Sequence, residues 1–229
     1  GFALTYLGLY LSILLAARLL RLSPRTAKSL AVCSLFPNSG NMGLSLTFFA
    51  LGEAGLLRAV VYFILSSAVM FGLGPAFIRG GGLLEGLRFT LRLPLFYALF
   101  LGLLLKGLGV GLPFRLDEGV RLMGQAAIPV LLLTLGMQMA KTPFQVGAFE
   151  LTASGLRLLL AYGVGLLLGL PRLEHQVLVL QSATPIAVNA FLLTREFGQD
   201  ATRVARSVVV STFLAFLTLP LVLFLIGVR

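Results

Sequence analysis

PNSGN at residues 37–41 and PIAVN at residues 185–189 are the two stretches that determine how the helices of this chain are built. In each, a proline precedes an asparagine by four residues inside an otherwise apolar segment. Proline within a helix removes a backbone hydrogen bond and collides with the carbonyl four residues earlier. In lipid, such a break persists only where protein or a water-filled cavity satisfies the freed backbone groups. The stretches therefore predict two broken membrane helices around a binding site.

The composition around these stretches is that of an integral membrane protein. Hydrophobic residues make up 58% of the 229 residues and charged residues 11%, whereas a soluble domain carries roughly a quarter charged residues. The long, continuous apolar runs predict an all-α membrane protein. We attribute the net charge of +10 to Lys and Arg at the ends of spans and expect no nucleic-acid partner. One cysteine and one histidine leave no basis for a disulfide or a metal cluster, and no cofactor is expected.

Eight apolar segments are long enough to cross a bilayer as helices, which takes about 20 residues each. They cover residues 2–20, 26–51, 56–78, 87–108, 118–140, 149–170, 174–197 and 202–228. The connections after the odd-numbered segments carry more Lys and Arg than the others. Because these residues mark cytoplasmic loops, we expect both ends of the chain outside, with the protein in a bacterial-type inner or plasma membrane.

The two halves of the chain resemble each other at a displacement of about 148 residues. Ser34, Pro37 and Asn41 in the first half match Ser182, Pro185 and Asn189 in the second. Five crossings separate the matching segments, and an odd number reverses direction, so the sequence predicts an inverted repeat. The second unit has five segments and the first has three. We therefore expect a five-plus-five fold in which two further helices precede Gly1.

The candidate substrate-binding residues surround the two prolines. The N-terminus of a half-helix presents unpaired N–H groups and a positive dipole end that suit a carboxylate. The carbonyl ends could instead hold a cation. Alternatively, the prolines only bend packed helices, and the asparagines join neighbouring helices by hydrogen bonds. The candidates are Pro37, Asn38, Ser39, Asn41, Ser182, Thr184, Pro185 and Asn189, with Gln125 as an additional residue.

The charged residues narrow the mechanism. All eight carboxylates fall near the ends of spans, which argues against a carboxylate proton relay. Arg157 lies inside a span and could meet an anion, but we expect its side chain to extend to the membrane interface. Ser39 and His175 do not predict a protease, because His175 lies about ten residues, or roughly 15 Å, from the helix break. We therefore expect no enzyme activity, and inverted repeats with broken helices favour a transporter over a channel.

The residues around both prolines resemble the crossover motifs of the auxin efflux carrier family. LFPNSGNMGL at residues 35–44 resembles the first motif, and TPIAVNAF at 184–191 followed by REFG at 195–198 is similar to the second. The tail at residues 211–220 also resembles that family. The wider group includes sodium symporters of bile-acid type, whose crossover sequences match less well.

The resemblance implies a ten-helix transporter with two domains. Residues 1–79 and 148–229 correspond to a transport domain, and residues 83–141 correspond to a scaffold that also mediates a homodimer. Members export auxin or move dicarboxylates such as malate and malonate, and the family's crossover residues fall on Pro37, Asn38, Asn41, Pro185 and Asn189. The prediction is a secondary transporter of a small organic anion working by alternating access. A sodium-coupled symporter and a non-transporting sensor or structural subunit are the alternatives, and Na⁺ and H⁺ stay open as coupling ions.

Overall fold

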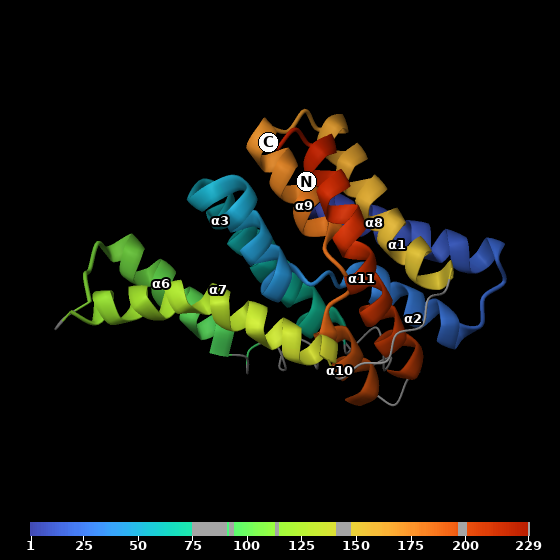
Figure 1. The fold of residues 1–229 in the computed structure, drawn as a ribbon, viewed down its shortest axis with the longest axis horizontal. Coiled ribbons are helices and arrows are strands. Elements are labelled where there is room, and N and C mark those ends of the chain that lie inside the picture. The colour runs from blue at the N-terminus through green and yellow to red at the C-terminus, as the bar shows by residue number, and fades with distance from the viewer. Residues whose placement is uncertain (75–90, 92–93, 113–114, 141–147, 197–200, 229) are drawn as a thin grey trace.

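A computed structural model describes residues 1–74, 91, 94–112, 115–140, 148–196 and 201–228, and in these ranges every element is a helix (Figure 1). The first half contains α1 (Phe2–Leu19), α2 (Pro24–Leu35), the π-helix η1 (Ser39–Leu44), α3 (Ser45–Ala68) and the π-helix η2 (Val69–Leu73). The remainder contains α6 (Pro94–Leu108), α7 (Leu116–Ala140), α8 (Ala148–Leu167), α9 (Arg172–Ala183), α10 (Val188–Glu196) and α11 (Ala201–Leu225). The predicted all-α fold is confirmed.

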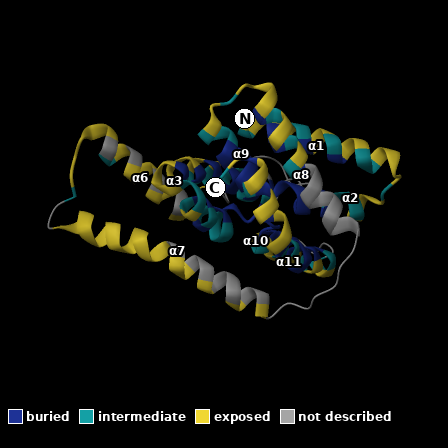
Figure 2. Ribbon diagram, turned by 45° about the horizontal axis from the view of Figure 1, so that its top comes forward, coloured by how far each residue is buried: buried dark blue, intermediate teal, exposed yellow. Residues whose placement is uncertain are grey.

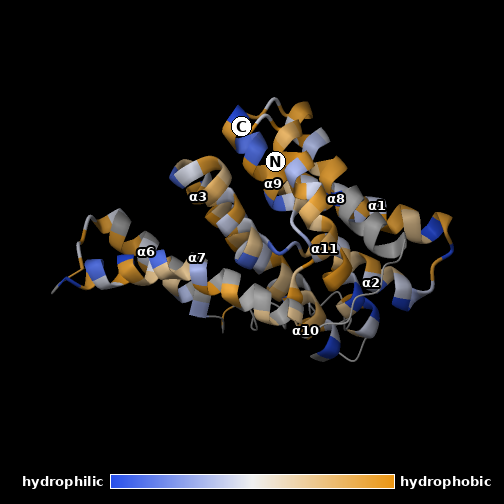
Figure 3. Ribbon diagram, in the orientation of Figure 1, coloured by the Kyte–Doolittle hydropathy of each residue, from blue (hydrophilic) through white to orange (hydrophobic). Residues whose placement is uncertain are grey.

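Three helices of the described chain are long and apolar enough to cross a membrane: Phe2–Leu19, Ser39–Gly72 and Ala201–Leu225. Their outer faces carry exposed large hydrophobic residues, such as Leu15 on α1 and Phe224 on α11. Figure 3 shows hydrophobic residues along most of the length of these helices. An apolar surface of this kind is stable against lipid chains and not against water. The chain is an integral membrane protein, while its eight predicted spans stay a prediction.

The two predicted helix breaks are present. The helix α2 begins with Ser23 as its N-cap, whose Oγ accepts a hydrogen bond from the Thr26 N–H at 3.3 Å, and it ends at Leu35, two residues before Pro37. The helix α9 ends at Ala183, and Thr184 is extended with φ −60° and ψ 151°. The residue before a proline disfavours the helical conformation, which accounts for both ends. The predicted segments 26–51 and 174–197 are therefore each divided into two pieces.

A second kind of interruption occurs at Gly52, inside α3. Its φ of 65° and ψ of −164° lie outside the helical region, in a part of conformational space that glycine enters at little cost. The kink falls between the predicted segments 26–51 and 56–78. The 34-residue stretch from Ser39 to Gly72 is thus two helical pieces that meet at Gly52.

The core of the molecule surrounds the two breaks. Phe36 and Ile186, which lie in the breaks, are 2% and 0% exposed. They pack in one cluster with buried residues from α1, α2, α3, α8, α9, α10 and α11. Figure 2 shows this buried centre, with the described side chains of α7 exposed and the helix extending away from it. The breaks are therefore held inside the helix bundle.

Both ends of the chain lie beside the start of α9 (Figure 1). Gly1 faces the side chains of Leu170 and Leu178, and Arg172 donates a hydrogen bond from Nη2 to the Gly227 carbonyl at 2.9 Å. The two ends therefore share one end of the bundle. Which side of the membrane they face stays a prediction.

Candidate functional site

The two breaks pair with each other through their backbones. The Asn38 N–H donates to the Pro185 carbonyl at 2.7 Å, and the Ala187 N–H donates to the Phe36 carbonyl at 2.9 Å. Pro37 and Ile186 thereby form an isolated antiparallel β-bridge. Backbone groups released from two helices satisfy one another without water, as a low-dielectric interior requires. We call this pairing, residues 36–38 with residues 185–187, the crossing.

The carbonyl that each proline frees also has a partner. Pro185 cannot donate to the Gln181 carbonyl, and the Thr184 Oγ1 hydroxyl donates to it instead, at 2.7 Å. Pro37 cannot donate to the Cys33 carbonyl, which accepts from Arg157 Nη1 at 3.3 Å. The Ile186 N–H on the other side of the break donates to Ser211 Oγ at 3.0 Å. Side chains from within and outside the broken helices therefore complete the backbone hydrogen bonding.

Arg157, on α8, binds the C-terminal ends of both half-helices. Its side chain is 1% exposed. Nε donates to the Ser182 carbonyl and Nη2 to the Thr184 carbonyl, both at 2.8 Å. On the other half-helix, Nη1 lies 3.3 Å from the Cys33 carbonyl and 3.5 Å from the Ser34 carbonyl. A planar guanidinium with five donors suits this set of acceptors, and a positive charge is favourable at helix C-termini.

The expectation that Arg157 reaches the membrane interface is therefore wrong. The side chain instead binds carbonyls at the ends of two helices that lie at the same depth. Unsatisfied carbonyls in lipid cost several kcal/mol each, so hydrogen bonding to them outweighs extension to the interface. The need for a donor can be read from the sequence: two proline breaks create orphan carbonyls, and Arg157 lies in the middle of a predicted span. The packing of α8 against both breaks could not be predicted from the sequence.

Eight of the nine candidate site residues lie at the crossing or within one helical turn of it, with different exposure. Asn41 is half-buried and Asn189 is exposed. The other six are buried: Pro37, Asn38, Ser39, Ser182, Thr184 and Pro185. Asn38 is the N-cap of η1, and its buried Nδ2 has no hydrogen-bond partner among the described residues. A buried donor without a partner is costly and marks a place where a ligand or water would be stabilising.

Gln125, the ninth candidate, lies on α7, a helix that contacts both η1 and α3. It lines a groove of about 750 Å³ between α3 and α7. Phe48, Phe49, Glu53 and Arg121 are among the other residues that line this groove. Among the described residues that line this groove with Gln125, none is another of the candidate site residues.

Two hydroxyl side chains of α3 that sequence reasoning missed, those of Thr47 and Tyr62, tie α3 to α9. The Tyr62 hydroxyl lies 3.1 Å from Ser182 Oγ, and Gln181 Nε2 donates to Thr47 Oγ1 at 2.9 Å. These partners are separated by 120 and 134 residues, so no local pattern announces the pairs. Gly43 of η1 lies so close to Gln181 that a Cβ there would overlap the Gln181 amide. The π-turn at η1 thus rests directly on α9, and π-turns occur frequently at functional sites.

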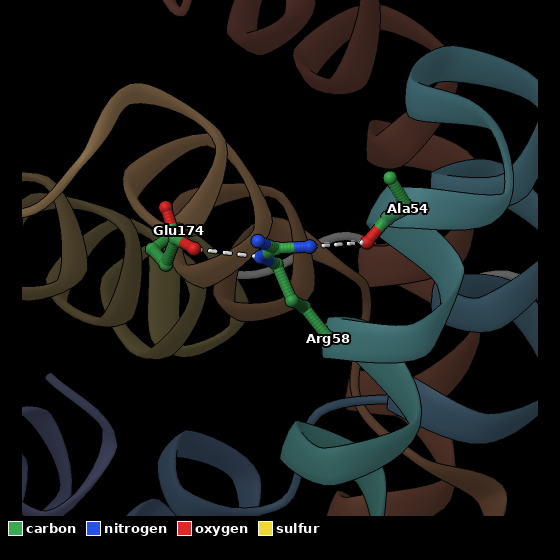
Figure 4. A network of polar contacts seen from close by, with 3 residues as sticks. All are labelled: Ala54, Arg58 and Glu174. Carbon is green, nitrogen blue, oxygen red and sulfur yellow. Dashed lines mark hydrogen bonds and ion pairs between the residues drawn. The ribbon is translucent and has the colours of Figure 1, made fainter.

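An exposed ion pair links the same two helices farther from the crossing. Arg58 Nε on α3 donates to Glu174 Oε1 on α9 at 2.7 Å, and Arg58 Nη1 donates to the Ala54 carbonyl at 2.9 Å (Figure 4). A related contact joins α11 to α2, where Arg203 Nη1 donates to Thr26 Oγ1 at 3.0 Å. Each broken helix is therefore fastened near its start to the long helix that follows the other break.

Buried crossing half-helices within a bundle of apolar, span-length helices are typical of membrane transporters, and the sequence comparisons show that class. Residues 85–223 match the family described as Membrane transport protein, and the chain belongs to this family. The expected membership of the auxin-efflux-carrier type is thereby confirmed. The matched proteins are transporters and not enzymes, as the sequence predicted.

Three relatives extend this result. An uncharacterized transporter of Methanothermobacter thermautotrophicus is 31% identical over 84% of this chain and 66% of its own length. A protein of Rhizobium meliloti named "Putative malonate transporter" is 26% identical over 83% of this chain and 64% of its own. An uncharacterized transporter of Methanocaldococcus jannaschii is 22% identical over 92% of this chain and 72% of its own. The chain thus spans about two thirds of the length of the first two relatives.

Proposed function

We propose that the protein is a secondary transporter that carries a small organic anion and holds its carboxylate at the crossing. The observation that supports this most is the buried guanidinium of Arg157, which donates to four neutral backbone carbonyls. Among the described residues, no carboxylate forms an ion pair with it. A buried charge without a counter-ion is costly, and an anion bound nearby reduces that cost.

The helix termini at the crossing favour the same ligand. The carbonyl ends of α2 and α9 already have Arg157 as their donor. The N-terminal ends of η1 and α10 present backbone N–H groups of their first turns and the positive end of the helix dipole. Asn38 Nδ2, at the start of η1, adds an unpartnered donor, and Asn41 and Asn189 lie within the first turns of the same two helices. These are donors in an arrangement suited to a carboxylate.

A small dicarboxylate is the substrate class that we propose. The name of the Rhizobium meliloti relative contains malonate, and the resemblance to auxin efflux carriers implies organic anions of this size. Malonate carries two carboxylates close together, so one can face the donors of η1 while the other faces those of α10.

Alternating access follows from the proposed symmetry of the two halves. An antiparallel bridge is itself two-fold symmetric, and this one joins Pro37 to Ile186, the residue next to Pro185, which is the counterpart of Pro37 in the predicted repeat. The hydrogen bond between α3 and α9 and the hydrogen bond between α11 and α2 are also equivalent when the two halves of the chain are exchanged. In this proposal α1–α3 and α8–α11 move as one transport domain against a scaffold that contains α6 and α7. Inverted repeats operate in this way in other secondary transporters.

The test is uptake of radiolabelled malonate by full-length protein in proteoliposomes, with binding measured by thermal shift. We expect Asn38→Ala and Asn189→Ala each to weaken binding about tenfold or more, because a hydrogen bond to a charged group contributes about 1.5–3 kcal/mol. Ser12→Ala is the matched control, since Ser12 Oγ donates to the Gly8 carbonyl within α1. Unchanged uptake in both asparagine variants would contradict the site. Absence of flux in wild type, with intact binding, would favour a sensor.

A further inference from the structure

The carbonyl ends of the two half-helices converge on one point, and a cation already occupies it. Four backbone oxygens, those of Cys33, Ser34, Ser182 and Thr184, lie between 2.8 and 3.5 Å from the guanidinium nitrogens of Arg157. Two of these residues belong to α2 and two to the end of α9. Converging carbonyls at the ends of broken helices are also the ligand type with which transporters hold Na⁺.

A second cation is disfavoured at this point. The four oxygens are engaged by a charged group that is 1% exposed. Two positive charges a few ångströms apart repel strongly in an interior of low dielectric constant. The oxygens therefore cannot bind a mobile ion unless the guanidinium leaves, and Arg157 is covalently part of α8.

We infer that Arg157 is a tethered cation that takes the place of a coupling ion at the crossing. This rests on the proposed function, which it deepens: anion binding at the crossing is independent of sodium, because the positive charge that organises the carbonyl ends is supplied by the chain. Arg157 is a positioning residue here. It fixes the two half-helix ends relative to each other and to α8, and the N-terminal ends of η1 and α10 then receive the substrate.

The inference predicts that removing the side chain creates a site for a soluble cation. Arg157→Ala vacates the volume and removes the guanidinium donors from the four carbonyls. Guanidinium at millimolar concentration then restores the thermal stability and the anion binding of this variant, because it carries the same donors in the same plane. Arg157→Lys retains one charge but not the fork, so we expect intermediate stability and a smaller response to guanidinium.

The experiment uses purified full-length protein and measures thermal unfolding and malonate binding in sodium, choline and guanidinium chloride. For wild type we expect the same malonate affinity in sodium and in choline. For Arg157→Ala we expect affinity about tenfold or more lower in choline, with recovery in guanidinium. Arg18→Ala is the control, because Arg18 is an exposed arginine at the end of α1 and its loss creates no such response.

Two outcomes overturn the inference. One is a wild-type affinity that rises tenfold or more in sodium. The other is an Arg157→Ala protein whose unfolding responds to guanidinium no differently from that of Arg18→Ala. If Arg157→Ala does not fold, two other measurements still test the inference. They are the malonate affinity of wild type in sodium and in choline, and the response of Arg157→Lys to guanidinium. If malonate does not bind, thermal stability tests the tethered cation separately from the proposed substrate.

Discussion

Single residues at the crossing act through contacts between segments far apart in the chain. Arg157 serves α2 and α9 together, and Gln181 of α9 reaches Thr47 of α3. Such contacts depend on the size and shape of each side chain, because a side chain packed between two helices has little room to move. The effect of a substitution at these positions is therefore set by the opposing helix.

Gly43→Ala tests the close contact between η1 and α9. The added Cβ overlaps the Gln181 amide, so we expect Gln181 to move and its hydrogen bond to Thr47 to be lost. Overpacking of this kind costs about 1–3 kcal/mol, which would lower the midpoint of thermal unfolding and weaken substrate binding. Thermal unfolding in detergent measures the first effect and thermal shift with malonate measures the second.

The control for this change is Gly163→Ala on α8. Among the described residues, no atom beyond the helix's own neighbouring backbone lies within 4 Å of a Cβ at that position, so the added methyl group meets open space. Alanine in a helix interior is more favourable than glycine by about 0.5–1 kcal/mol. We therefore expect Gly163→Ala to unfold at the same or a higher temperature. Equal stability of the two variants would contradict the close contact at Gly43.

Sequence patterns predicted the residues of the crossing better than the partners of those residues. Pro37 and Pro185 act through a local rule of backbone geometry, so the breaks follow from sequence. The destination of the Arg157 side chain depends on how α8 packs and was predicted wrongly. The pairing of Tyr62 with Ser182 links positions 120 residues apart and has no local signal. The same limit applies to Asn41 and Asn189, which match in the two halves of the sequence although Asn41 is half-buried and Asn189 is exposed.

At the scale of elements, each half-helix ends where its own backbone hydrogen bonds end, and hydrogen bonds to other segments replace them. α2 and α9 end before their prolines, and the two breaks exchange backbone hydrogen bonds. The predicted ends of α7, α8 and α11 lie within a few residues of the observed ones, since apolar runs and short polar connections mark them. Gly52 also follows from sequence as a connection, although α3 continues on both sides of it.

Pro37→Ala tests whether the first break depends on its proline. The new N–H can donate to the Cys33 carbonyl, which allows α2 to extend and turns the Asn38 N–H away from Pro185. We expect this variant to keep or gain thermal stability while losing most of its uptake, because the crossing is replaced by continuous helix. Uptake in proteoliposomes and thermal unfolding are measured on the same preparation.

Pro220→Ala provides the comparison, because Pro220 lies inside α11 and is exposed. This substitution also adds a backbone donor within a helix, so we expect a similar or greater gain in stability. Uptake should stay at the wild-type level, since Pro220 is not part of the crossing. If Pro220→Ala lost as much uptake as Pro37→Ala, disruption of the crossing would not explain the loss of uptake in Pro37→Ala.

At the scale of the whole molecule, the described helices form a bundle around the crossing, with α7 extending from it (Figure 1). The proposed motion places α3 and α9 in one rigid body, and the Arg58–Glu174 ion pair lies within that body. The groove that contains Gln125 lies between α3 and α7, which the proposal assigns to different bodies. A covalent link at the ion pair should therefore leave transport intact, whereas a covalent link across the groove should stop it.

Cross-linking distinguishes these two places. We expect a bismaleimide link between Arg58→Cys and Glu174→Cys to leave uptake largely unchanged, because α3 and α9 move together. A link between Glu53→Cys and Arg121→Cys, across the groove, should stop uptake because it joins the two bodies. Cys33 is buried, which limits its reaction with the reagent. Arrest by the first link and not by the second would contradict the proposed division into domains.

The contact between Arg157 and the end of α2 has a consequence for how the chain is made. Arg157 follows its acceptor Cys33 by 124 residues, so α2 enters the membrane long before its donor has been synthesised. During that interval the broken end of α2 must be shielded by water, lipid headgroups or the insertion machinery. A nascent chain that stalls before α8 therefore carries an uncapped helix end in the bilayer, a defect by which quality-control proteases can recognise it.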